Sequence, residues 1–330
     1  MTELLKVRDL QTHFFTKEET IKAVNGVSFD LRAGETFGLV GESGCGKSVT
    51  CRSIVRLIRP PGEIISGTVY YNGVELNSLS EEKMRKIRGK EIGMVFQEPM
   101  TALNPVLRIK EQIFEAFEGR GYPKGEKYDR AIHALQMVGI PSPRERIEEY
   151  AHQFSGGMRQ RAMIAIALAA EPKILLADEL TTALDVTIQD QIMKLLNHLR
   201  QQLGMSIILV THDLGVVAQM CDRLAVMYAG YVMELCDVVT LFASPRHPYT
   251  YGLICSLPQS NVIGRKLKPI GGSPPDLGAL PSGCPFVPRC EFKEDLCSQT
   301  LPELQEIKPG HFSRCHCLEK MDRVPGIIDA

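Results

Sequence analysis

The chain has 330 residues, with 38 Lys and Arg against 39 Asp and Glu, so its formal net charge is −1. A length beyond that of one ordinary core predicts either one large domain with an appendage or two domains. The balanced charge lacks the basic footprint of nucleic-acid-binding proteins. With 44% hydrophobic and 23% charged residues, the composition is typical of a soluble globular protein.

Hydropathy predicts no membrane span. The longest purely apolar run, residues 162–170, is much shorter than the ~20 residues that a spanning helix needs. The first residues include acidic Glu3 and Asp9 and do not resemble a signal peptide. We therefore expect the protein to stay in the cytoplasm, where thiols are normally reduced.

The first forty residues predict antiparallel β structure. Apolar and polar side chains alternate over 5–8, 22–24 and 27–31. Phe14 and Phe15 are placed in the turn after the first strand. One of them could stack on the adenine of a nucleotide, and Phe14 is the candidate; the alternative is a hydrophobic plug.

Residues 41–48 read Gly-Glu-Ser-Gly-Cys-Gly-Lys-Ser, the G-x-x-x-x-G-K-S pattern of a phosphate-binding loop. An apolar run over 35–40 predicts a buried strand before the loop, and apolar residues at helical spacing follow it until Pro60. Glycines let backbone N–H groups approach phosphate oxygens. Lys47 is expected to reach the β- and γ-phosphates, and the Ser48 hydroxyl to ligate Mg²⁺. The predicted ATP-binding residues of the loop are Gly41, Glu42, Ser43, Gly44, Cys45, Gly46, Lys47 and Ser48.

Downstream, a small β element is predicted at 67–71, with Asn72-Gly73 as a hairpin signal. The next strand, 92–96, ends on Gln97. A polar amide at the carboxyl end of a buried strand is where an open α/β sheet holds its ligand, so Gln97 could touch a metal or an attacking water. The alternative is an ordinary surface glutamine. Residues 98–160 then predict an inserted helical subdomain, with helices at 109–117 and 128–138.

Ser155 precedes an apolar helix that is predicted to start near Met158. Serine is a favourable N-cap, and a Ser-Gly-Gly turn at a helix N-terminus can bind an anion. An ordinary cap is the alternative. Because the chain also has a phosphate-binding loop, we predict that Ser155, Gly156 and Gly157 form a second anion site.

Two more apolar strands end on polar residues. The strand over 174–177 leads into Asp178 and Glu179, and buried acids at this position need a compensating charge such as Mg²⁺. Asp178 suits the metal, and Glu179 suits a general base that polarises water. A helix over 187–203 and a strand over 206–210 follow, and His212 after that strand is expected to act on the γ-phosphate.

At this point residues 4 to about 250 resemble an ATP-binding cassette of ABC transporters. The matching motifs, in order, are Walker A (41–48), the Q-loop (Gln97), the signature (154–161), Walker B (174–179), the D-loop (183–185) and the H-loop (His212). The resemblance implies an α/β fold: a P-loop NTPase core with an antiparallel β subdomain and a helical subdomain.

The resemblance also implies a site. Two cassettes would pair head to tail over two ATP molecules, with Ser155–Gly157 of one covering the γ-phosphate held by Lys47 of the other. The implied catalytic residues are Glu179, His212 and Gln97, and the implied Mg²⁺ ligands are Ser48, Gln97 and Asp178. The chain departs from the family pattern twice, with Cys45 where Ser is common and Leu180 where Pro is usual.

The last part of the chain narrows the resemblance to one group of ABC-transporter ATPases. The segments 244–250 (SPRHPYT) and 283–290 (GCPFVPRC) resemble the C-terminal extension of dipeptide/oligopeptide-permease ATPases. We therefore expect a cassette over 1–250 and an extension over 251–330. Nine of the twenty prolines lie between 258 and 309, so this extension is predicted to be rich in loops and to have little hydrophobic core. Such a segment gains stability from a covalent or metal cross-link.

Five of the ten cysteines lie in the last 47 residues, which in the cytosol favours a metal or cluster over disulfides. Four of them are spaced C-x5-C-x6-C-x17-C, which fits neither a tight zinc ribbon nor a ferredoxin run. The resemblance implies a [4Fe–4S] cluster; zinc or no metal are the alternatives. Its role is expected to be structural, because nothing in the sequence places it near the ATP motifs. The implied ligands are Cys284, Cys290, Cys297 and Cys315, with Cys317 as a spare.

As a whole, the resemblance implies an ATP-hydrolysing importer subunit that powers uptake of di- or oligopeptides. It implies two transmembrane permease subunits, a second ABC ATPase subunit (or a homodimer in isolation) and, indirectly, an extracytoplasmic peptide-binding protein, but no nucleic acid. The chain would lie at the cytoplasmic face of the membrane as a peripheral protein. The alternatives are a cassette ATPase of DNA repair or translation, a redox-sensing regulatory ATPase, and an importer of nickel or another small solute.

Overall fold

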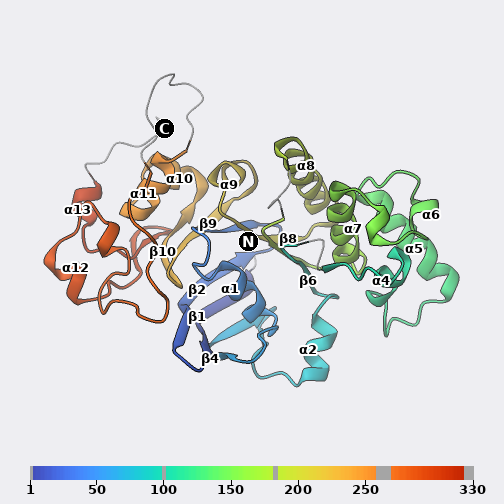
Figure 1. Ribbon diagram of the computed structural model, residues 1–330, viewed down its shortest axis with the longest axis horizontal. Helices are drawn as coiled ribbons and strands as arrows, with labels where there is room; N and C mark the ends of the chain where they lie inside the picture. Colours follow the sequence, from blue (N-terminus) through green and yellow to red (C-terminus); the bar gives the residue numbers. More distant parts are fainter. Residues whose placement is uncertain (1–2, 99–101, 181–184, 258–268, 323–330) are drawn as a thin grey trace. The chain divides into compact units, whose positions relative to one another are not determined.

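A computed structural model describes residues 3–98, 102–180, 185–257 and 269–322 of the chain (Figure 1). The chain divides into two compact units. Unit 1 comprises Met1–Arg32, Thr36–Asn77 and Thr211–Ala330, and unit 2 comprises Ala33–Glu35 and Ser78–Val210. The boundary predicted near residue 250 stays a prediction.

Unit 1 contains an antiparallel sheet in the order β2-β1-β4-β5. Its alternating pattern buries one face of the long first strand. Phe14 and Phe15 belong to the end of that strand and pair with β2, so their predicted place in a turn is wrong. Asn72 and Gly73 have φ of 47° and 77°, the positive values that a tight hairpin turn requires. The strands are β1 (Glu3–Phe15), β2 (Thr20–Arg32), β4 (Gly62–Tyr71) and β5 (Val74–Glu75).

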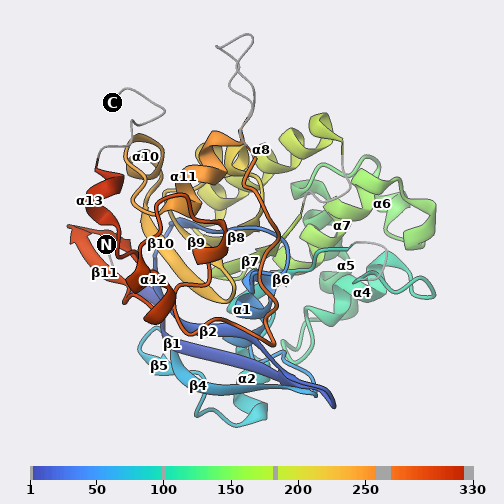
Figure 2. The ribbon, with the colours of Figure 1, turned by 60° about the vertical axis from the view of Figure 1, so that its left-hand side comes forward.

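A second set of strands in unit 1 runs β3-β9-β10-β12-β11. The first pair is parallel and the others are antiparallel. The extension therefore adds β12 beside β10 and β11 beside β12. Figure 2 labels β10 and β11. These strands are β3 (Thr36–Val40), β9 (Arg223–Tyr228), β10 (Tyr231–Asp237), β11 (Gln305–Lys308) and β12 (His311–Ser313).

Helix α1 (Lys47–Ile54) ends four residues before Ile58, the last apolar position assigned to it from the sequence. Arg56 has a φ of 54°, and Leu57 N donates to Arg52 O, so the chain leaves the helix before Pro60. The other helical segments of unit 1 are α9 (Leu214–Met220), α10 (Val238–Ala243), α11 (Pro248–Cys255), the 3-10 turn Val287–Arg289, α12 (Asp295–Gln299) and α13 (Leu318–Met321).

The C-terminal extension packs into the core of unit 1. Phe286 lies with its ring centroid 5.3 Å from those of both Tyr228 on β9 and Tyr249 on α11. Phe286 is 3% exposed and the two tyrosines are 1% or less. The extension thus shares a hydrophobic core with the strand that runs beside β3.

Unit 2 is built on parallel strands in the order β8-β7-β6, with β7 and β8 buried on both faces. Helices α4, α5 and α7 pack against one another (Figure 1). Helix α5 starts four residues before Tyr128, the start predicted from the sequence. Its first turn is polar, so apolar spacing does not mark it. Within the described ranges, no helix is both long and apolar enough to cross a membrane. The elements are α2 (Glu81–Ile87), β6 (Ile92–Val95), α4 (Ile109–Glu115), α5 (Lys124–Met137), α6 (Pro143–Arg146), the 3-10 turn Ala151–Gln153, α7 (Gly156–Leu168), β7 (Ile174–Asp178), α8 (Val186–Leu203) and β8 (Ser206–Thr211).

Candidate nucleotide site and cysteine pocket

The loop 41–48 connects β3 to α1 in unit 1, in a shape that requires glycine. Gly46 has a φ of 101°, and a Cβ there would lie 2.2 Å from Ala23 O. A Cβ on Gly41 would lie 2.1 Å from Met227 O. The tight fit leads the backbone directly into the N-terminus of α1, and the N-terminus of a helix favours an anion.

Lys47 is held inside this loop. Its Nζ donates to Gly41 O at 2.8 Å and to Glu42 O at 2.9 Å, and the residue is only 4% exposed. Cys45 is also buried, and burial raises the pKa of its thiol, so it remains neutral. Ser48 is half-buried in the first turn of α1.

In unit 2, the parallel register brings Gln97 and Glu179 together. Val95 on β6 lies opposite Ala177 on β7, so the residues two positions further on are neighbours at the carboxyl ends of the strands. Gln97 Nε2 donates to Glu179 Oε2 at 2.8 Å. The structure thus brings these two side chains together at the carboxyl ends of neighbouring parallel strands.

The end of β7 carries two carboxylates in different settings. Asp178 is fully buried, whereas Glu179 is partly exposed. Glu179 has a φ of 47°, uncommon for a residue with a side chain, and such backbone strain clusters at functional sites. Leu180 after it is buried. Of the D-loop, residues 183 and 184 lie outside the described residues, and Asp185 caps α8 by accepting from Ile188 N at 2.9 Å.

Ser155 caps α7 as predicted, since its Oγ accepts from Met158 N at 3.3 Å. The helix begins at Gly156, two residues earlier than expected. Ser155 and Gly156 are exposed, and a Cβ on Gly156 would meet nothing within 4 Å. The turn is therefore open to approach by another molecule.

Two predicted site residues in unit 1 lie at element ends. His212 is exposed directly after β8, and the next residue, Asp213, caps α9. Phe14 packs against Gly62, where a Cβ would lie 2.6 Å from the ring, while Phe15 is 45% exposed. This packing fits the plug alternative as well as stacking, so the adenine role of Phe14 stays a prediction.

One pocket of unit 1, here called the cysteine pocket, gathers thiols from separate segments of the extension. Cys297 Sγ lies 3.6 Å from Cys317 Sγ, and Cys284 N donates to Cys297 O at 2.8 Å. A Cβ on Gly283 would lie 2.2 Å from Cys297 O, so glycine permits this close approach. The cysteines that line the pocket are Cys284, Cys290, Cys297, Cys315 and Cys317.

The pocket is a poor place for unpaired thiolates. Burial raises the pKa of the Cys284 thiol to about 11 and that of Cys317 to about 12. Burial also raises the pKa values of Cys290 and Cys315. Without a cation these side chains are neutral thiols, and a metal or cluster would bind them as thiolates with release of protons.

A second group of metal-ligating residue types lies between β10 and β12: Glu234, Cys236 and His311 place a ligand atom each within 4.8 Å of one another. Both Glu234 oxygens already accept hydrogen bonds, from Arg246 N, from His247 N and from the His311 ring. We interpret this group as a buried polar contact that fastens β12 to β10.

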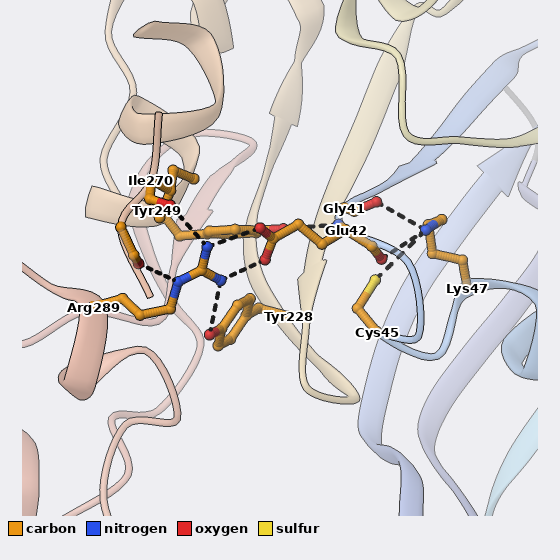
Figure 3. A network of polar contacts seen from close by, with 9 residues as sticks. Gly41, Glu42, Cys45, Lys47, Tyr228, Tyr249, Ile270 and Arg289 are labelled. Atoms are coloured by element: carbon orange, nitrogen blue, oxygen red, sulfur yellow. Dashed lines mark hydrogen bonds and ion pairs between the residues drawn. The ribbon is translucent and has the colours of Figure 1, made fainter. Parts of the chain in front are cut away.

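Arg289 joins the extension to the nucleotide loop (Figure 3). Its guanidinium donates to both Glu42 oxygens, at 2.6 and 2.9 Å, and hydrogen bonding to that carboxylate raises the pKa of Arg289 further above its ordinary value. The extension therefore contacts the nucleotide loop, a proximity that nothing in the sequence indicated. The sequence holds no direct indication of this contact, because 247 residues separate Arg289 from Glu42. The one available signal was that Arg289 is the only charged residue within 283–290.

Similar proteins of known name match nearly the full chain. The dipeptide transport ATP-binding protein DppD of Bacillus subtilis is 48% identical over 317 residues, covering 96% of this chain and 95% of the relative. The oligopeptide transport ATP-binding protein AppD of the same organism is 49% identical, covering 97% and 98%. For OppD of Escherichia coli the identity is 46%, covering 94% and 92%.

Solved structures agree on the fold. A dimeric ATP-binding cassette in a post-hydrolysis state, bound to ADP and Pi, matches with a TM-score of 0.63 and 31% identity, covering 71% of this chain and 98% of that one. A Clostridium perfringens cassette described as part of the ABC transporter complex cbiONQ matches with a TM-score of 0.63 and 29% identity, covering 74% and 92%.

Two protein-family models match separate parts of the chain. Residues 24–182 match the ABC transporter family, and residues 233–297 match the oligopeptide/dipeptide transporter C-terminal region. With the α/β cassette fold, the phosphate-binding loop and relatives of 46–49% identity, this chain belongs to the ATP-hydrolysing, ATP-binding subunits of ABC transporters, in the group that carries this C-terminal region.

Proposed function

We propose that this chain hydrolyses ATP at a site built on the loop 41–48. Backbone N–H groups at the end of the loop and at the N-terminus of α1 would cradle the phosphates, and Lys47 would neutralise the β- and γ-phosphates. Ser48, Gln97 and Asp178 are the proposed Mg²⁺ ligands, which suits the hard oxygen donors that this ion prefers. Phe14 is proposed to contact adenine. The buried, glycine-dependent loop around Lys47 supports this assignment.

Glu179 is proposed as the general base for in-line attack of water on the γ-phosphate. Its contact with Gln97 supports a shared role in orienting that water. His212 would act on the γ-phosphate. Ser155, Gly156 and Gly157 would cover ATP held by a partner cassette, and the exposure of Ser155 and Gly156 fits this role. When bound, Mg²⁺ would supply charge neutralisation.

We further propose that hydrolysis powers uptake of di- or oligopeptides. The observation that carries this proposal is the 46–49% identity, over nearly the full chain, to proteins named for dipeptide and oligopeptide transport. Substrate would pass through two separate permease subunits, supplied from an extracytoplasmic peptide-binding protein. The chain would sit at the cytoplasmic face, paired with a second cassette ATPase. The named relatives give no support to DNA repair, translation, redox sensing or nickel transport.

Affinity purification of the tagged chain from detergent-solubilised native membranes tests this proposal. We expect two multispanning membrane proteins and a second cassette ATPase to co-purify. In liposomes with the binding protein, di- or oligopeptides should stimulate ATP hydrolysis and nickel should not. Recovery of nucleic acid without membrane proteins would contradict the transport assignment.

Lys47→Ala is expected to weaken ATP binding about 100-fold, because a buried triphosphate loses its cation. The measurement is the Kd of a fluorescent ATP analogue with Mg²⁺. Lys194→Ala, which removes an exposed lysine on α8, is the matched control and should bind like the parent protein. Unchanged affinity in Lys47→Ala would reject the loop as the ATP site.

For the extension, we propose a [4Fe–4S] cluster held by Cys284, Cys290, Cys297 and Cys315. The donor set fits, since all four line one pocket and cysteine thiolates are the ordinary ligands of such clusters. Cys317 lines the same pocket, so the choice between it and Cys315 is left to experiment. The cluster would tie the segments 284–297 and 315–317 together.

A further inference from the structure

Glu42 puts a carboxylate into a loop that is proposed to hold a triphosphate. At an effective dielectric constant near 20, an uncompensated unit charge within ~10 Å of another changes a binding constant by about tenfold. Repulsion between Glu42 and the phosphates would therefore work against ATP binding. The loop needs either a neutral side chain at this position or a cation that compensates the carboxylate.

Arg289 supplies that cation from the extension (Figure 3). Its side chain is 4% exposed, and all five of its N–H donors can be assigned. Two form the bidentate pair with Glu42, which fixes the plane of the carboxylate. The others meet Tyr228 OH at 3.2 Å, Gly271 O at 2.8 Å and Ile270 O at 3.4 Å.

The backbone of Glu42 is held as well. Its N–H donates to Tyr249 OH at 2.9 Å, and its carbonyl oxygen accepts from Lys47 Nζ. Tyr249 is fully buried and packs with Tyr228. Glu42 thus contacts the extension through its carboxylate and the phosphate-binding lysine through its carbonyl.

We propose that Arg289 is a positioning residue of the nucleotide loop, which raises ATP affinity by neutralising Glu42 and drawing its carboxylate away from the phosphates. This inference rests on the proposed ATP site at residues 41–48. The extension would then contribute to ATP binding, because Arg289, directly before Cys290, compensates the negative charge of Glu42 in the loop.

The test measures the Kd of a fluorescent ATP analogue with Mg²⁺ on the full chain. Arg289→Ala should weaken binding about tenfold, since it leaves Glu42 charged and uncompensated. Glu42→Gln should strengthen binding, because the Arg289 cation is then uncompensated and attracts the phosphates. The double variant Arg289→Ala/Glu42→Gln should recover to within about threefold of the parent, because the repelling charge is gone.

Arg314→Ala is the matched control. Arg314 is an arginine of the same extension, and its guanidinium donates to the backbone oxygens of Val232 and Pro302. The Arg314→Ala variant should have a lower Tm but the same Kd as the parent protein. Equal weakening by Arg314→Ala, or no recovery in the double variant, would overturn the inference. If Lys47→Ala weakens binding and Arg289→Ala does not, only this inference fails; if Lys47→Ala has no effect, the proposed ATP site fails.

Discussion

Glu179→Gln is expected to keep ATP affinity while the rate of ATP hydrolysis falls about 100-fold or more. The amide has the size of the carboxylate and can still accept the hydrogen bond from Gln97, so the packing at the end of β7 is preserved. What is lost is the basic oxygen that would take a proton from the attacking water. The measurement pairs steady-state kcat for ATP hydrolysis with the Kd of an ATP analogue.

Glu171→Gln provides the control for this change. Glu171 is exposed before the amino end of β7, so the same replacement is made at the opposite end of the same strand. Because ligands bind at the carboxyl ends of such strands, its kcat should equal that of the parent protein. Near-normal turnover in Glu179→Gln would remove this residue from the role of base.

Protein prepared without oxygen is expected to be brown and to contain about four irons per chain. Serine at any one of Cys284, Cys290, Cys297 or Cys315 should abolish the colour, because a lost thiolate leaves the cluster incompletely held. The extension should then become sensitive to proteolysis, since ligand binding and local folding are coupled. Iron content, the visible spectrum and limited proteolysis are the measurements.

Two further variants make this test specific. Cys255→Ser replaces a thiol outside the lining of the cysteine pocket and should keep the colour. Cys317→Ser should also keep it; loss of colour there, with Cys315→Ser unaffected, would move the fourth ligand to Cys317. If the anaerobic protein is colourless and contains zinc, the cysteines bind zinc and not a cluster. If it contains no metal, they are plain thiols.

The contact of Arg289 with Glu42 changes what these variants should do to ATP binding. A purely structural cluster, as expected from the sequence, predicts that the ATPase activity of the cassette largely survives its loss. Arg289 directly precedes Cys290, so loosening this segment would withdraw the cation from Glu42. We therefore expect Cys290→Ser to weaken ATP affinity towards that of Arg289→Ala.

Local features of this protein were determined by the sequence alone. The loop 41–48 is encoded by glycines at positions where a Cβ would collide with the neighbouring backbone. The hairpin at Asn72-Gly73 and the cap at Ser155 depend on backbone angles and hydrogen bonds within a few residues. The ends of α1 and α5 were predicted less well, because capping and polar first turns leave a weak signal in apolar spacing.

Contacts between distant segments were decided only by the tertiary structure. That Gln97 and Glu179 both end buried strands is visible in the sequence, but their contact required β6 and β7 to be parallel neighbours in register. The ion pair of Arg289 with Glu42 exists because Phe286 packs on Tyr228 and Tyr249 and so carries the extension to the loop. Side-chain spacing along a chain records periodic faces, and it does not record which faces pack together.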